Sequence, residues 1–149
     1  MYYDTFDIVF QEVPNEISLA FRFTGCPLRC PGCHSESTKL AKGNFLDVDG
    51  YIKILEKYRH SVSCVLFIGG EWNPRCSEYL EFAKMMGYKT CLYTGLSSIT
   101  DKLRSSLTYL KTGPWVESLG GLDSVHTNQR FVDLRSGDVL NHLFRKNEK

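Results

Sequence analysis

The hydrophobic pattern predicts that strands and helices alternate along most of the chain. Residues 62–68, VSCVLFI, form a continuous apolar and β-branched run, which is typical of a strand buried on both faces of a parallel sheet. Residues 88–94, YKTCLYT, predict another strand, and a shorter one is expected at 109–111. Between these runs the apolar residues recur at helical spacing. This alternation predicts parallel βα units.

Three helices are predicted from the apolar spacing and from residues that start or stop a helix. Either Asp47 or Asp49 can cap the first helix, and Asn73 with Pro74 marks the start of the second. Gly87 is a natural stop for that second helix. The expected helices cover 48–58, 74–86 and, more weakly, 99–107.

Both ends of the chain predict antiparallel hairpins. At the N-terminal end, FDIVFQEV and EISLAFRF cover 6–23 and are joined at Pro14-Asn15. At the other end, QRFVDL and VLNHLF flank a turn at 135–138. No linker or internal repeat divides the chain, so we expect one domain over residues 1–149. A full (β/α)8 barrel typically needs about 250 residues, so the expected fold is an α/β, partial TIM-like barrel with a hairpin at each end.

Composition narrows the class of protein without indicating a charged partner. Of 149 residues, 42% are hydrophobic, 13% aromatic and 23% charged, as in ordinary globular domains. The 18 basic residues oppose 17 acidic ones, and a formal net charge of +1 gives no reason to expect a nucleic acid or an anionic membrane as partner. No apolar run is long enough to span a membrane and no leader pattern is present, so we expect a cytoplasmic protein.

Six cysteines in such a chain call for an explanation, since closely spaced cysteines in reducing compartments usually bind metal or take part in catalysis. Three of them, Cys64, Cys76 and Cys91, are isolated within apolar or helical patterns, where a thiol behaves as a small hydrophobic group. The other three are clustered in a segment rich in glycine and proline that follows a predicted strand. That segment is TGCPLRCPGCH, with Cys26, Cys30 and Cys33.

The clustered thiolates suit several metal centres, and the residues alone leave the choice open. A zinc site would use the three cysteines with His34 or a distant cysteine, although the chain has no second CxxC or HxxxH motif. Cys30 and Cys33 could also form a redox dithiol, and a cluster that only transfers electrons would normally have a fourth thiolate. Three thiolates on a four-iron cluster leave one iron open for a small molecule. A four-iron cluster with such an open iron predicts radical chemistry.

Two motifs together resemble the radical S-adenosylmethionine enzymes: the C-x3-C-x2-C spacing, and the Gly69-Gly70-Glu71 segment that ends the core strand at 62–68. More closely, the chain resembles the activating proteins of anaerobic ribonucleoside-triphosphate reductase. The matching segments are TGCPLRCPGCHS at 24–35, the Gly-Gly-Glu loop, LYTG at 92–95, and LGGLDS followed by TNQRF within 119–131. The resemblance spans nearly the whole chain, and the short length fits this group as well.

The resemblance implies a four-iron four-sulfur cluster held by Cys26, Cys30 and Cys33, with S-adenosylmethionine bound at the open iron. In that family the Gly-Gly-Glu element contacts the methionine amino group, which maps onto Gly69, Gly70 and Glu71. Gly32 and His34, on either side of Cys33, would lie against the nucleoside. Thr94, at the end of the strand over 88–94, is a candidate contact for the ribose or the methionine.

The implied reaction makes a 5'-deoxyadenosyl radical that takes a hydrogen atom from a glycine of the anaerobic ribonucleoside-triphosphate reductase. A low-potential protein such as flavodoxin would supply the electron. An incomplete barrel leaves one side open, which suits a glycine-bearing loop of a large partner. The alternatives are an activase of another glycyl-radical enzyme, of the formate-lyase type, a small-molecule radical enzyme, or a non-catalytic zinc or iron-sulfur binding module.

Overall fold

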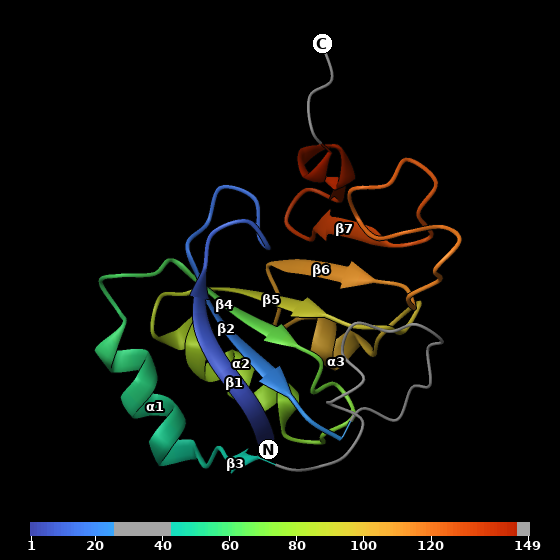
Figure 1. The fold of residues 1–149 in the computed structure, drawn as a ribbon. Coiled ribbons are helices and arrows are strands. Elements are labelled where there is room, and N and C mark those ends of the chain that lie inside the picture. Colours follow the sequence, from blue (N-terminus) through green and yellow to red (C-terminus); the bar gives the residue numbers. More distant parts are fainter. Residues whose placement is uncertain (26–42, 146–149) are drawn as a thin grey trace.

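A computed structural model describes residues 1–25 and 43–145, which form one mixed sheet with helices on one side (Figure 1). The strands are β1 (Tyr2–Val9), β2 (Ser18–Phe23), β3 (Asn44–Phe45), β4 (Cys64–Ile68), β5 (Lys89–Tyr93), β6 (Tyr109–Thr112), β7 (Arg130–Asp133) and β8 (Asp138–Val139). The helices are α1 (Val48–Lys57), α2 (Cys76–Met85) and α3 (Asp101–Arg104), and a 3-10 turn, η2, covers Asn141–Phe144.

The strand order confirms the predicted fold class. The order is β3-β1-β2-β4-β5-β6-β7-β8, in which β2, β4, β5 and β6 run parallel and the outer pairs run antiparallel. In the described part of the chain β3 and β8 are the edges of the sheet, so it stays open instead of closing into a full barrel. None of the helices in the described ranges, 1–25 and 43–145, combines the length and apolar character needed to cross a membrane.

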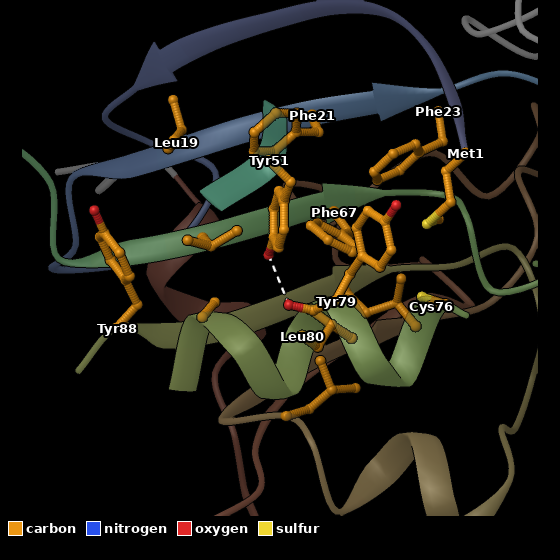
Figure 2. Close-up of a cluster of buried hydrophobic side chains, with 14 of the residues drawn as sticks. Met1, Leu19, Phe21, Phe23, Tyr51, Phe67, Cys76, Tyr79, Leu80 and Tyr88 are labelled. Atoms are coloured by element: carbon orange, nitrogen blue, oxygen red, sulfur yellow. Dashed lines mark hydrogen bonds between the residues drawn. The ribbon is translucent and has the colours of Figure 1, made fainter. Parts of the chain in front are cut away.

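Aromatic rings fill the space between the sheet and its helices. Phe21 and Phe23 of β2 and Phe67 of β4 pack with Tyr51 of α1 and Tyr79 of α2 (Figure 2). These five side chains are at most 1% exposed, and each buried ring contributes about 1.5–3 kcal/mol to folding. The Tyr51 hydroxyl donates a 2.8 Å hydrogen bond to the Tyr79 carbonyl. The rings therefore hold α1 and α2 firmly against β2 and β4.

Loops and the 3-10 turn η2 cover the other face of the sheet, while α1, α2 and α3 lie on the first. Leu66 and Cys91 belong to a second apolar cluster on this face, together with Phe131 of β7. Val13 from the loop between β1 and β2 and Leu122 from the segment between β6 and β7 pack onto this cluster. The parallel strands are thus buried on both faces, which explains the uninterrupted apolar run at 62–68.

A buried carboxylate ties the strands together at their amino-terminal edge. Glu16 is 7% exposed, and its Oε1 accepts a 2.7 Å hydrogen bond from the Ser63 hydroxyl. Its Oε2 accepts from Lys89 Nζ at 3.0 Å and from the Tyr109 hydroxyl at 2.8 Å. Both oxygens of Glu16 are therefore bonded, to groups beside or within β4, β5 and β6.

The N-terminal hairpin is present, but its connection is longer than predicted. β1 and β2 pair from Tyr3↔Phe23 to Val9↔Ser18, so residues 10–17 form the loop. The turn at Asn15, with φ of +65°, lies inside this loop, where the Glu16 N–H donates to the Val13 carbonyl at 3.2 Å. The prediction extended both strands too far because Val13 is apolar for a different reason, namely its packing on the face of the sheet.

The C-terminal hairpin is also shorter than predicted. β7 and β8 pair at Val132↔Val139 and Asp133↔Asp138, but residues 141–144 form η2 instead of a strand. The reason is the Asn141 side chain, whose Oδ1 accepts from the Phe131 N–H and whose Nδ2 donates to the Gln129 carbonyl, both at 2.8 Å. One carboxamide thus replaces backbone pairing along β7.

The predicted helices all exist, with adjusted bounds. Asp47 caps α1 by accepting a 2.7 Å hydrogen bond from the Gly50 N–H, so the alternative cap, Asp49, lies within the first turn. α2 begins only at Cys76, because Asn73 Oδ1 first accepts from the Arg75 N–H at 2.9 Å and forms a separate turn. α3 is reduced to four residues, and β3 was not predicted at all.

Candidate functional site

The site lies where the parallel strands end, along their carboxyl-terminal edge. Backbone hydrogen bonds join the neighbouring ends: Gly69 N–H donates to the Tyr93 carbonyl at 2.8 Å, and Thr94 N–H donates to the Lys111 carbonyl at 2.9 Å. A further bond of 2.7 Å runs from the Gly113 N–H to the Leu96 carbonyl. The loops after β4, β5 and β6 are therefore held in fixed positions next to one another.

Two glycines allow the chain to turn sharply after β4. Gly69 has φ of +78° and Gly70 has φ of +97°, a region that residues with a Cβ rarely adopt. A Cβ on Gly69 would lie 2.7 Å from the Trp72 ring, and a Cβ on Gly70 would lie 2.9 Å from the Phe23 ring. Gly70 thus packs against the end of β2, two residues before Gly25. This contact places the Gly-Gly-Glu loop beside the strand that leads into the cysteine motif.

The next residue, Glu71, is fixed by one hydrogen bond and leaves one oxygen open. The Thr94 hydroxyl donates to Glu71 Oε1, which links the ends of β4 and β5. Glu71 Oε2 is buried, and within residues 1–25 and 43–145 it has no hydrogen-bond partner. A buried acceptor without a partner costs about 1–3 kcal/mol, and a donor group bound at this oxygen would remove that cost.

The charge on Glu71 is controlled by opposing effects. Burial raises the pKa of its carboxyl, while the Thr94 hydrogen bond, the backbone N–H of Glu71 itself and the positive charge of Lys111 act in the other direction. Cys76 of α2 faces the same carboxylate, which adds to burial in raising the pKa of that thiol to about 12. A cationic ligand group would favour the ionised carboxylate by the same electrostatics as Lys111.

A cavity of about 180 Å³ adjoins this edge. The end of β2 lines it through Phe23, Thr24 and Gly25, and the loop after Glu71 lines it through Trp72 and Asn73. The end of β2 and the loop after Glu71 therefore meet around this space, although Gly69, Gly70, Glu71 and Thr94 themselves do not line it. Trp72 is half-buried and packs on the core, so its ring forms a fixed wall of the cavity.

The cysteine motif itself lies outside the described residues. Cys26, Cys30 and Cys33, with Gly32 and His34, fall within residues 26–42, so their proposed roles stay predictions. The structure does bring together the other named residues, since Gly69, Gly70, Glu71 and Thr94 are neighbours. In the described ranges, no group of three or more His, Cys, Asp or Glu residues is placed to hold a metal ion.

The isolated cysteines behave as core residues, as predicted. Cys64 and Cys91 are fully buried and Cys76 is 1% exposed, and none forms a disulfide. Burial raises the pKa of Cys64 to about 12 and that of Cys91 well above its ordinary value. Because metal ligands are thiolates, such suppressed ionisation makes these three cysteines poor ligands.

Lys111 was not predicted as a site residue, although the alternation of side chains along β6 indicates on which face of the sheet it lies. Leu110 packs toward the helices, so its neighbours Tyr109 and Lys111 belong to the opposite face. The Lys111 Nζ lies 5.7 Å from the centre of the Tyr93 ring and donates to the Gly113 carbonyl at 3.4 Å. Its cation therefore stands at the same strand edge as Glu71.

No family model matches this chain, and searches of curated proteins and of solved structures found no significant match. The case for a function therefore rests on the sequence motifs and on the geometry at the strand edge.

Proposed function

We propose that this protein is a radical S-adenosylmethionine activase that generates a glycyl radical on an anaerobic ribonucleoside-triphosphate reductase. The observation that carries the proposal is the open Glu71 oxygen in the loop that packs against the end of β2. The Cys26, Cys30 and Cys33 motif follows that strand directly in the sequence. The cysteine motif thus follows, in the sequence, the strand end against which the Glu71 loop packs.

The residues fit the two cofactors by the chemistry of their donors. Three thiolates spaced C-x3-C-x2-C are suitable ligands for a four-iron four-sulfur cluster with one iron left open. Glu71 Oε2 offers a buried carboxylate oxygen to the ammonium group of S-adenosylmethionine, and charge-assisted bonds of this kind are the strong ones. The glycines at 69 and 70 allow the sharp turn that brings the Glu71 loop against the end of β2.

Cys26, Cys30 and Cys33 would hold the cluster, and Glu71 would bind the amino-acid part of S-adenosylmethionine. Together these cofactors would supply one-electron chemistry: with one electron from an external low-potential donor such as flavodoxin, S-adenosylmethionine would yield methionine and 5'-deoxyadenosine while the partner's glycine loses a hydrogen atom and becomes a glycyl radical. The contribution of the chain is to bind and orient the reactants. Glu71 would orient the amino-acid part, and Trp72 forms one wall of the neighbouring cavity.

The first experiment tests the cluster. After anaerobic reconstitution the protein should be brown and contain about four iron and four sulfide per chain, and Cys30→Ala should lose both. Cys64→Ala is the matched control, because Cys64 is a buried thiol at the start of β4, the end of that strand remote from the site. Colourless protein with stoichiometric zinc would contradict the proposal and favour a zinc module.

The second experiment tests the reaction and the partner. Reduced protein with S-adenosylmethionine should release 5'-deoxyadenosine, and Glu71→Gln should raise the KM for S-adenosylmethionine. Mixing with anaerobic ribonucleoside-triphosphate reductase should give a glycyl radical signal in electron paramagnetic resonance. If a competent reductase gives no signal while a formate-lyase type partner does, the assignment of the partner is wrong.

A further inference from the structure

We propose that Thr94 is a positioning residue, whose hydroxyl holds Glu71 so that Oε2 accepts a hydrogen bond from a cationic ligand group. Under the proposed function, on which this identification of the ligand rests, the group is the ammonium of S-adenosylmethionine. Thr94 therefore acts differently from the direct contact with the ribose or the methionine that the sequence suggested.

The hydrogen bonds of Thr94 fix the direction of its only hydroxyl proton. The Leu96 N–H donates to Thr94 Oγ1 at 3.1 Å, so this oxygen is already an acceptor. Its proton is directed to Glu71 Oε1. A hydroxyl has a single proton to give, so Thr94 has none left for a ligand, and this proton can affect a ligand only through Glu71.

The surroundings leave Thr94 little freedom to turn away. The residue is 2% exposed, and its own N–H donates to the Lys111 carbonyl at 2.9 Å. Its side chain thus bridges the end of β5 to the loop after β4 from a fixed backbone position. Because Oε1 of Glu71 is occupied by this bridge, Oε2 is the atom that remains for a ligand.

The same bridge favours the charged form of Glu71. Burial favours the neutral carboxyl and raises its pKa, and a neutral Glu71 would carry its proton on the open oxygen and repel an ammonium group. The Thr94 hydrogen bond opposes this effect, as does Lys111 of β6. Cys76 of α2, whose pKa is raised, faces Glu71 as a neutral thiol at pH 7. Loss of the hydroxyl should therefore raise the pKa of Glu71.

The test compares Thr94→Val, which loses the hydroxyl, with Thr94→Ser, which keeps it. The matched control is Thr90→Val: Thr90 is also on the β5 segment and fully buried, but its hydroxyl donates to the Ser106 carbonyl at 2.7 Å, away from Glu71. Infrared difference titration of reconstituted protein, with Glu71→Gln identifying the band, measures the pKa of Glu71. We expect a higher pKa in Thr94→Val alone. An unchanged value in that variant overturns the positioning role.

Ligand binding gives the second readout. Thr94→Val should bind S-adenosylmethionine about tenfold more weakly, the scale of one hydrogen bond to a charged group, while binding 5'-methylthioadenosine, which lacks the amino-acid group, as well as the wild type does. Equal binding of S-adenosylmethionine by both proteins refutes the inference. If the wild type binds no S-adenosylmethionine, the proposed function and the identification of the ligand group as an ammonium are refuted. The infrared titration still decides whether Thr94 affects the pKa of Glu71.

Discussion

The change Tyr109→Phe tests whether the buried carboxylate at the amino-terminal edge stabilises the sheet. Tyr109 is 4% exposed. Its hydroxyl donates to Glu16 Oε2 at 2.8 Å and accepts from Arg135 Nη2 at 3.1 Å. The substitution removes one oxygen atom and creates little empty space. Its effect should therefore report the hydrogen bond to Glu16 rather than a change in packing.

The expected loss is about 2 kcal/mol of unfolding free energy. A hydrogen bond to a charged group contributes about 1.5–3 kcal/mol, and Glu16 keeps bonds from Ser63 and Lys89 after the substitution. The Lys89 side chain is 44% exposed, so solvent weakens its compensation. Arg135 loses little, because it retains both bonds to Asp133. For a chain of this size the melting temperature should fall by about 4–8 °C.

The stability lost in Tyr109→Phe should also change with pH in a definite direction. Burial alone would raise the pKa of Glu16, but the hydrogen bonds from Ser63, Lys89 and Tyr109 outweigh it and lower the pKa. The ionised network is therefore fully stabilising above the unfolded value of 4.5, and its contribution is lost as the pH falls through the lower folded value. The cost of Tyr109→Phe should shrink in acid over this window.

Urea denaturation followed by circular dichroism at pH 7 and below pH 4.5 measures both effects. Glu16→Gln provides the second arm, because the neutral amide removes the charge and flattens the dependence on pH in that window. In the Glu16→Gln background Tyr109→Phe should cost less than it does alone. A loss under about 0.5 kcal/mol at pH 7, or the same loss in both backgrounds, would refute the reasoning.

Three further substitutions test other parts of the fold. Gly70→Ala should lower the unfolding free energy by about 3 kcal/mol, because a residue with a Cβ is strained at φ of +97° and this Cβ would lie 2.9 Å from the Phe23 ring. An unchanged urea midpoint would contradict this prediction. Asp47→Ala removes the cap of α1 and should cost about 1 kcal/mol in the same assay, whereas Asp47→Asn should cost little. Asn141→Ala leaves two backbone groups without partners, the Phe131 N–H of β7 and the carbonyl of Gln129 just before it. The change should cost about 2–3 kcal/mol, with faster hydrogen exchange at Phe131 as the local sign.

The strands and helices were predictable wherever burial alone decides the residue type. The run at 62–68 is apolar at every position except serine and cysteine because β4 is covered on both faces, and that pattern can be read without a structure. The hairpin bounds were not predictable in this way. Val13 is fully buried although it lies in a loop, and Asn141 pairs with β7 through its side chain. An apolar or amide residue does not reveal which contact it makes.

The candidate site was predictable in position but not in detail. Parallel strands place their carboxyl ends on one edge, so Gly69, Gly70, Glu71 and Thr94 were expected near one another from the order of elements alone. The bond between Thr94 and Glu71 depends on how β4 and β5 are staggered, with Ile68 opposite Tyr93, which is a tertiary quantity. Lys111 lies at this edge for the same reason, because it is opposite Tyr93 in the pairing of β5 with β6.

Two glutamates at opposite edges of the parallel strands differ in the number of hydrogen-bond donors that reach their carboxylate oxygens. Glu16 has hydrogen-bond donors for both oxygens, and its pKa is lowered, so it contributes stability whenever it is ionised. Glu71 has a donor for only one oxygen among the described residues, and its pKa is raised, so as it stands it costs stability. A fold stabilised at one edge tolerates such a cost at the other, and a cationic ligand that bonds to the open oxygen recovers it as binding free energy.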